Sequence, residues 1–318
     1  MLVALSAIAA WPFIGVSSEL LNLGVTVLIF AALAYSLEAV YATVGLLALS
    51  QGAVWGVGAY VGALTIIHYH FPFLLALLAG GIGGAIAGFL VGLPSLRTKG
   101  HYYLILTFAA AEAARISGDN WWGLLKGSFG ITLVEPAVIL GTPLGTTTQL
   151  YFLALGGLLV VIVGLTLLQR LRMGRLMLAV RENEKLAESL GIRTGWSKLS
   201  AFALAGFLAG IVGVIYLHYV LHIEPDLFGG WAGVQIALIL LIGGSRSRLG
   251  PIAGAVVVFM VPPLLHLDPL VTQMTYGVAL IALILFVPRG IAGGVAAAMQ
   301  VVAQTVVLRF RSLSADRT

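Results

Sequence analysis

The chain contains no cysteine and very few charged residues. The absence of cysteine from its 318 residues excludes disulfide bonds, thiolate metal sites and cysteine nucleophiles. Charged residues make up 9% of the sequence, whereas soluble domains carry about 25%. Hydrophobic residues make up 60%, and the mean hydropathy is +1.07. The composition therefore excludes a soluble globular protein and predicts an all-α integral membrane protein.

Motifs of the common catalytic and nucleotide-binding sites are also missing. The sequence holds no G-x-x-x-x-G-K-[ST], no H-E-x-x-H and no G-x-S-x-G. We therefore expect no enzyme activity, no ATP bound by this chain itself and no cofactor. His218 and His222 stand four residues apart, but with no cysteine and only dispersed carboxylates we expect no metal there. The pI near 9.6 reflects basic loops and does not indicate nucleic-acid binding.

Apolar runs long enough to cross a bilayer follow one another along a single domain, residues 1–318. They predict about eight to ten membrane helices, with ten as the preferred number. Two of the runs look discontinuous because glycines and polar residues interrupt them, and broken helices at membrane depth often surround a substrate path. These two are 46–67 and 228–243, and the others are 2–16, 20–42, 73–93, 101–117, 150–168, 199–220, 250–267 and 270–287.

The charges of the connecting loops predict the orientation. When the spans alternate, almost all of the 17 basic residues fall on one side, and acidic residues dominate the other. The positive-inside rule makes the basic side cytoplasmic. The segment 170–198 and the C-terminal tail 309–318 are then cytoplasmic. The loop 118–149 is then external, and it is long enough to meet an external binding protein.

The segment 170–198 is the most informative part of the chain, because it is charged and lies between hydrophobic spans. Its residues are good helix formers, and they predict a helix from Arg181 to Leu190. Gly191 stands where a helix commonly ends in a left-handed cap. On charge alone, a solvated connector helix would explain the segment.

Five stretches of the sequence carry the motifs of one family in the family's order. They resemble the branched-chain amino acid ABC importer permeases, and most closely the LivM-type membrane subunit. Two positions depart from the family pattern: Lys185 and Leu186 replace the first two residues of the importer signature E-A-A-x-x-x-G, and Ser245-Arg246 replaces smaller residues. The stretches are VGLLALSQGAVWGVGAYVGA (44–63), LPSLRTKGHYYLILTFAAAEAAR (93–115), RENEKLAESLGI (181–192), IALILLIGGSRSRLGPIAGA (236–255) and VPRGIAG (287–293).

The resemblance implies a permease subunit of an ATP-driven importer in a bacterial or archaeal cytoplasmic (inner) membrane. Its implied partners are a second, LivH-like permease subunit, two cytoplasmic ATP-binding subunits and an external or periplasmic solute-binding protein. The implied solutes are branched-chain or other amino acids, with urea and short amides as further candidates. The implied coupling residues, which would dock on an ATP-binding subunit, are Arg181, Glu182, Asn183, Ala187 and Gly191.

Five residues are candidates for the translocation path. Ser50 and Gln51 offer hydrogen bonds to a polar solute, and Trp55 and Tyr60 offer an aromatic gate. Glu112 is a carboxylate inside a predicted span, which is costly and therefore a functional hypothesis by default. Each of these residues could instead have a purely structural role. Ser50 and Gln51, like Trp55 and Tyr60, also suit contacts between packed helices. Glu112 can form an ion pair with Arg115, one helical turn further along the chain.

A different class of function remains open, namely an ATP-independent secondary transporter or channel for a small polar solute. Such a protein needs several titratable or oxygen-rich groups at mid-membrane. The spans offer mainly Glu112, with Glu38 near an inner helix end. A membrane anchor or scaffold would explain the segment 170–198 but not the discontinuous helices. The pattern therefore favours the importer permease over both.

Overall fold

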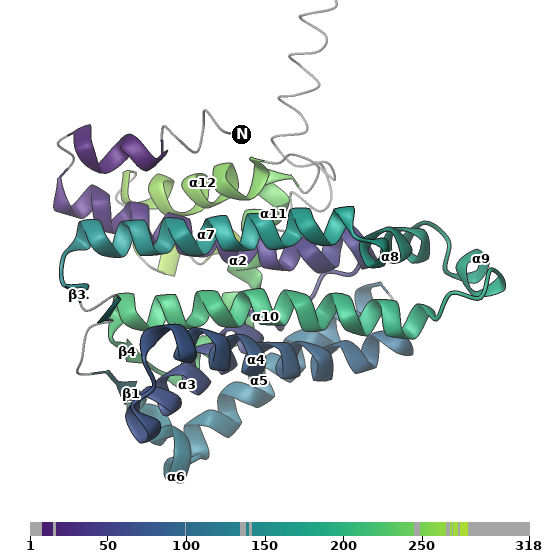
Figure 1. Cartoon of the computed structure of the whole chain (residues 1–318), viewed down its shortest axis with the longest axis horizontal. Coiled ribbons are helices and arrows are strands. Elements are labelled where there is room, and N and C mark those ends of the chain that lie inside the picture. The colour runs from purple at the N-terminus through teal and green to yellow at the C-terminus, as the bar shows by residue number, and fades with distance from the viewer. Residues whose placement is uncertain are drawn as a thin grey trace, which may run out of the picture.

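The computed structural model describes residues 8–14, 17–98, 100–133, 138–139, 142–244, 249–264, 268, 270–272 and 274–278. Within these residues the fold is helical, and the long helices run side by side in a bundle (Figure 1). The helices are α2 (Ser18–Val44), α3 (Gln51–Tyr69), α4 (Phe73–Gly92), α5 (His101–Asn120), α6 (Trp122–Leu125), α7 (Thr147–Arg170), α8 (Arg172–Glu182), α9 (Glu184–Ser189), α10 (Thr194–Val220), α11 (Gly230–Gly243) and α12 (Gly250–Leu264), with 3-10 turns η1 (Trp11–Ile14), η2 (Leu93–Leu96), η3 (Gly127–Phe129) and η4 (Pro225–Phe228).

Five helices of the described part are long and apolar enough to cross a membrane: α2, α3, α4 with its extension to Leu96, α7 and α10. α11 and the first part of α12 are apolar but shorter. The predicted span 101–117 is helical, as α5, but does not belong to the five. The structure thus agrees with an all-α membrane protein. Ten spans remain a prediction, since most of 2–16 and of 270–287, and the whole tail 309–318, lie outside the described residues.

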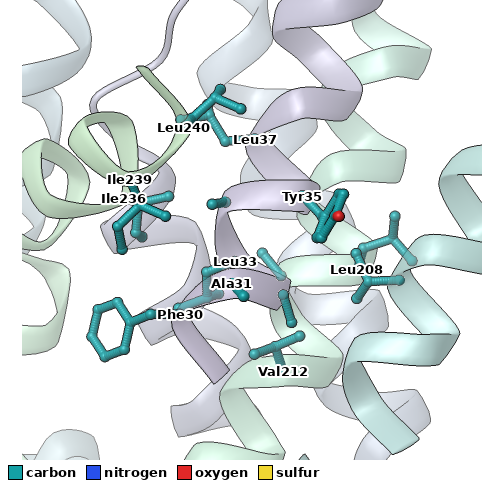
Figure 2. Close-up of a cluster of buried hydrophobic side chains, with 14 of the residues drawn as sticks. Phe30, Ala31, Leu33, Tyr35, Leu37, Leu208, Val212, Ile236, Ile239 and Leu240 are labelled. Carbon is teal, nitrogen blue, oxygen red and sulfur yellow. The ribbon is translucent and has the colours of Figure 1, made fainter. Parts of the chain in front are cut away.

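α2 forms the centre of the core. Leu33 and Leu37 are fully buried, and apolar side chains surround the helix on all sides, which is typical of a helix with no polar face. Figure 2 shows this helix between two neighbours, with its side chains meeting those of α10 on one side and of α11 on the other. The neighbouring side chains are Leu208 and Val212 from α10 and Ile236, Ile239 and Leu240 from α11. α2 is therefore the element through which the other helices are packed together.

α4 and α10 approach each other through glycines. A Cβ atom on Gly206 would lie 2.1 Å from the carbonyl oxygen of Gly84, and one on Gly84 would lie 2.2 Å from that of Gly206. A Cβ on Gly210 would lie 2.2 Å from the oxygen of Gly80, and Gly58 brings α3 to the same contact. Small residues let membrane helices pack at backbone distance. Some of the chain's 40 glycines thus allow α3, α4 and α10 to meet at backbone distance.

The predicted span 46–67 is not helical at its start: α3 begins only at Gln51 and then runs unbroken through the glycines to Tyr69. The side-chain amide of Gln51 donates to the Ser36 hydroxyl at 2.8 Å. Because Ser36 lies in the second half of α2, well before its end, α3 starts inside the bundle. The backbone before α3 is not helical, so its polar groups need other partners. One of them, the N–H of Leu49, donates a hydrogen bond to the Thr107 hydroxyl at 3.2 Å. Such backbone is tolerated at depth when protein groups satisfy it.

The loop predicted to be external, 118–149, is shorter than the sequence predicts. α5 continues to Asn120, and α7 begins at Thr147 after a capping box in which the Thr146 side chain and Gln149 satisfy each other's backbone N–H groups. Between them lie α6, η3 and three two-residue strands. β1 (Ile131–Thr132) pairs antiparallel with β4 (His222–Ile223), and β2 (Val138–Ile139) pairs antiparallel with β3 (Thr142–Pro143).

The prediction of a single helix from Arg181 to Leu190 is wrong. The chain forms two helices instead, because Asn183 has an extended backbone (φ −155°, ψ 101°) and separates α8 from α9. The Asn183 side chain accepts a hydrogen bond from the Leu186 N–H at 3.1 Å and so caps the second helix. The left-handed conformation predicted for Gly191 is confirmed, with φ +80°. α8 and α9 project from one end of the bundle, opposite β1 and β4 (Figure 1).

Candidate functional site

A pocket of about 740 Å³ opens among the helices near η4 and β4, toward the end of the bundle opposite α9. Five helices and the two short elements between α10 and α11 contribute to its wall. Pockets of a few hundred to about 1,000 Å³ are the usual size for small-molecule sites. The lining residues are Phe30, Trp55, Glu112, Arg115, Tyr216, Val220, His222, Ile223, Glu224, Asp226, Leu227, Gly229, Trp231, Ala232 and Gln235.

An ion cluster centred on Arg115 forms one wall. Its Nε donates to Glu112 Oε2 at 2.9 Å, and its Nη1 donates to Asp119 Oδ2 at 3.1 Å and lies 3.5 Å from Asp226 Oδ1. The other oxygen of Glu112 accepts the N–H of Gly230 at 2.9 Å. Gly230 is the first residue of α11, so Glu112 caps that helix, where a negative charge is favourable. The expected ion pair between Glu112 and Arg115 is confirmed.

Aromatic side chains form another part of the pocket wall. Trp55 is 1% exposed, and its ring meets those of Phe30 and Tyr216 edge to face, with centroids 5.6 and 4.8 Å apart. Its indole nitrogen is buried and has no hydrogen-bond partner among the described residues. A buried N–H without a partner is costly and is rare in native proteins. Trp55 is therefore both a packing residue and an unsatisfied donor beside the pocket.

The structure separates the five path candidates. Trp55 and Glu112 line the same pocket, whereas Ser50, Gln51 and Tyr60 do not. Ser50 and Gln51 are buried at the start of α3, where Gln51 binds Ser36 of α2. Tyr60 stacks on Phe228 and donates to the carbonyl of Ile223 at 3.3 Å. Gln51 and Tyr60 thus make contacts between elements, while the buried Ser50 hydroxyl has no hydrogen-bond partner among the described residues.

Several lining residues were not predicted as site residues. Glu224 and Asp226 served in the sequence only as markers of the external side, although they follow α10 directly. Trp231 and Gln235 lie in the first turns of α11. The sequence could have indicated them as site residues only because they fall in the run 228–243, which was predicted to be discontinuous. Nothing in the sequence links them to Phe30, because α2 meets α11 only through the fold.

His218 and His222 do not share a helix face. α10 ends between them at Leu221, which has a left-handed φ of +59°. His218 is buried, with Nδ1 2.8 Å from the carbonyl of Val214, while His222 lies in β4 and contacts Thr132 and Glu224. Among the residues that the structure describes, no group of three or more His, Asp or Glu side chains could hold a metal ion.

α8 is attached to the C-terminal end of α2 through Arg181. The guanidinium donates from Nη1 to the carbonyl of Ala42 at 2.7 Å and lies over the ring of Tyr41, 5.9 Å from its centroid. Its stem lies against Gly45, the left-handed cap of α2. The carbonyls of the last helical turn lack partners within the helix, and a cation there is favourable. Arg181 therefore binds the end of α2.

α9 is attached to the start of α10 by two polar contacts. Glu184 pairs with the buried ammonium of Lys198, and Glu188 accepts a hydrogen bond from the Thr194 hydroxyl at 2.8 Å. These two contacts hold α9 against the start of α10.

Two exposed leucines lie on α9 and at its C-cap, among polar residues. Leu186 is 56% exposed and Leu190 is 72% exposed. Glu182, Lys185 and Gly191 are exposed beside them.

Comparison with known proteins identifies the family. The family described as "Branched-chain amino acid transport system / permease component" matches residues 19–287. The chain belongs to this permease family. It is 28% identical over 314 residues to the high-affinity branched-chain amino acid transport permease LivM of Escherichia coli (strain K12), covering 91% of this chain and 74% of that protein. No solved structure matches it.

Two further relatives show the range of the family. The branched-chain amino acid permease LivH of Salmonella typhimurium is 25% identical over 284 residues, covering 83% of this chain and 91% of that protein. The autoinducer 2 import permease LsrC of Enterobacter sp. (strain 638) is 28% identical over 222 residues, covering 67% of this chain and 58% of that protein. The permeases similar to this chain thus carry names with different solutes.

Within this branched-chain permease, the predicted coupling residues fall into two groups. Glu182, Asn183 and Gly191 are exposed, whereas Ala187 is only 2% exposed. A charge placed at Ala187 would therefore disturb the chain's own packing. Arg181 is exposed but bonded to α2. The open apolar surface consists of Leu186 and Leu190 instead.

Proposed function

We propose that this permease is one membrane subunit of an ATP-driven importer that moves branched-chain or other amino acids across the cytoplasmic membrane. ATP hydrolysis belongs to separate subunits, two of which act together with a second, LivH-like permease and an external solute-binding protein. The observation that carries the proposal is the position of α8 and α9. They form an open projection at one end of the bundle, opposite β4 (Figure 1), and β4 contributes to the wall of the solute-sized pocket.

The contacts of the projection support a mechanical role. Arg181 attaches α8 to α2, and Lys198 and Thr194 attach α9 to α10. Both α2 and α10 also line the pocket, through Phe30 and Tyr216. A displacement of α9 by a closing pair of ATP-binding subunits would therefore act on both core helices. Rigid helices that join two sites are the physical requirement for such coupling.

The charges at the two ends support the orientation. Basic residues gather at the α8–α9 end, and the opposite end carries mainly carboxylates. The positive-inside rule then places α8 and α9 in the cytoplasm and the pocket toward the outside. The residues concerned are Arg97, Arg170, Arg172, Arg175, Arg181, Lys185, Arg193 and Lys198 with Glu182, Glu184 and Glu188 at the first end, and Glu19, Glu112, Asp119, Glu224 and Asp226 with Arg115 and Lys126 at the second.

A cysteine-free chain allows a direct test by site-specific cross-linking. Lys185→Cys, on the exposed face of α9, is expected to cross-link to an ATP-binding subunit and to react with an impermeant maleimide only from the cytoplasmic side. Val138→Cys, in the exposed β2 strand, is the matched control and should react only from outside, without that cross-link. Labelling of Lys185→Cys from the outside, or no cross-link in the assembled transporter, would contradict the proposal.

A further inference from the structure

Two polar contacts join α9 to the first two turns of α10, one near each end of α9. Glu184, the first residue of α9, pairs with Lys198. Glu188, close to its last residue, accepts a hydrogen bond at 2.8 Å from the hydroxyl of Thr194, the first residue of α10. A segment bound near both ends is held against rotation about the left-handed turn at Gly191, which leads from α9 toward α10. α9 and the start of α10 therefore form one rigid corner.

Lys198 is the residue of this corner whose burial requires a partner. It is 5% exposed, and lysine is almost never fully buried unless it is paired. Separating a buried ion pair leaves an uncompensated buried charge, which is strongly unfavourable. An exposed ion pair, by contrast, separates at little cost. The contact of Lys198 with Glu184 therefore resists separation of α9 from α10.

The junction between α9 and α8 is of a different kind. One residue with an extended backbone, Asn183, separates the two helices, and its side chain caps α9. Hinges are a few residues at the ends of elements whose φ and ψ absorb a movement. On the far side of Asn183, Arg181 binds α8 to α2. Asn183 thus stands between two bodies, α8 with α2 and α9 with α10.

α10 leads from the corner to the pocket. It runs from the α9 end of the bundle toward β4 (Figure 1), and its 27 residues span about 40 Å. Tyr216 and Val220, in its last two turns, line the pocket, and so do residues of the connector that follows, from His222 to Leu227. The corner and a part of the pocket wall are therefore opposite ends of one helix.

We propose that Lys198 is the positioning residue that makes α9 and α10 move as one body. A displacement imposed on α9 then reaches the pocket wall directly along α10, whereas it reaches α8 and α2 only across Asn183. Lys198 does not line the pocket and acts through Glu184. The proposal rests on the proposed function and adds to it the residue that transmits the movement and the helix that carries it.

The test measures how much solute moves for each ATP hydrolysed. The complete importer, with its partner permease, ATP-binding subunits and solute-binding protein, is reconstituted in proteoliposomes, and L-leucine uptake and phosphate release are followed in the same sample. Lys198→Met removes the ammonium group and keeps an apolar chain. We expect uptake per ATP hydrolysed to fall at least about fivefold, the lower end of typical coupling factors. Lys185→Cys in the same chain should still cross-link to an ATP-binding subunit.

Charge reversal separates a positioning role from a purely structural one. Glu184→Lys alone brings two ammonium groups together and should lower the ratio as Lys198→Met does. The double variant Glu184→Lys, Lys198→Glu restores an ion pair and should bring the ratio to within about twofold of the unmodified chain. Arg193→Met removes an exposed cation from the same corner, one residue before α10, and is the matched control that should leave the ratio unchanged.

Three results would overturn the proposal. They are a normal ratio in Lys198→Met, a double variant that fails to restore the ratio, and loss of the Lys185→Cys cross-link in Lys198→Met. The last would show that Lys198 holds α9 in place for docking rather than transmitting a movement. In each case the proposed function stands if the importer without these substitutions shows ATP-dependent uptake and the cross-link. Uptake without ATP, or no cross-link in that importer, would contradict the proposed function instead.

Discussion

Replacing Leu186 and Leu190 by aspartate is expected to lower ATP-driven uptake at least about tenfold, while the chain remains folded and inserted. The two side chains are 56% and 72% exposed, so the substitution removes little packing within the chain. In the assembled importer they would be buried against an ATP-binding subunit. Charges at the centre of such an interface commonly cost about 2 kcal/mol or more, which is more than tenfold in affinity. Co-purification of the ATP-binding subunits should fall in parallel.

A conservative pair serves as the control for this experiment. Leu186→Met with Leu190→Met keeps the apolar surface and should leave uptake and co-purification near normal. The aspartate variant should also show the same thermal unfolding temperature in detergent as the unmodified chain. Normal co-purification of the aspartate variant would show that α9 is a solvated connector. The account of α9 as the coupling element would then be wrong.

Gly206→Leu is expected to destabilise the bundle severely. A Cβ at this position would lie 2.1 Å from a backbone oxygen of α4, so the two helices must separate. Inserting bulk into a packed core commonly costs about 1–3 kcal/mol, and a clash with backbone costs more. We expect the thermal midpoint in detergent to fall by about 10 °C, at roughly 2–4 °C for each kcal/mol. Gly206→Ala should show a smaller fall in the same direction.

The chain supplies a matched control for the glycine experiment. Gly156 lies on the exposed side of α7, and a Cβ built there has nothing within 4 Å. Gly156→Leu makes the same change of residue in a membrane helix without a neighbouring backbone. It should leave the midpoint within about 2 °C of the unmodified chain. Equal midpoints for the two leucine variants would contradict the close contact of α4 with α10.

The apolar pattern predicted the helices well where composition decides them. α2, α4, α7 and α11 begin and end within a few residues of the predicted spans, because apolar runs and glycine or proline boundaries set their limits. The break before α3 was also predicted, from Ser50, Gln51 and the glycines after them. The apolar pattern does not predict how far inside the bundle α3 begins. That depth depends on a hydrogen bond from Gln51 to Ser36 of another helix.

The coupling segment shows why local rules were insufficient. Helix propensity favours one helix through Asn183, since its neighbours are good helix formers. The observed break follows from contacts outside the segment, where Arg181 binds α2 and Glu184 binds Lys198 of α10. These contacts hold the two halves in different directions, and Asn183 caps the second. The burial of Ala187 follows from the same arrangement and has no signal in the sequence.

The site was predicted in part. Glu112 and Trp55 were singled out because a carboxylate and an indole inside a membrane span need explanation, and both line the pocket. Their neighbours come from helices far apart in the chain. Phe30 and Trp231 are separated by about 200 residues, and only the packing of α2 against α11 brings them to the same wall. Such a set cannot be assembled from spacing within one segment.

Uptake into proteoliposomes tests the central claim most directly. The chain, its partner permease and the ATP-binding subunits are reconstituted into proteoliposomes. The solute-binding protein and radiolabelled L-leucine or urea are added on the side of the membrane from which the importer takes up its solute. The account predicts leucine uptake that requires both ATP and the ATP-binding subunits. Leucine uptake that persists without them, driven by an ion gradient, would contradict it. It would favour a secondary transporter, and the buried Glu38 of α2, whose Oε2 has no hydrogen-bond partner among the described residues, would be the carboxyl to examine.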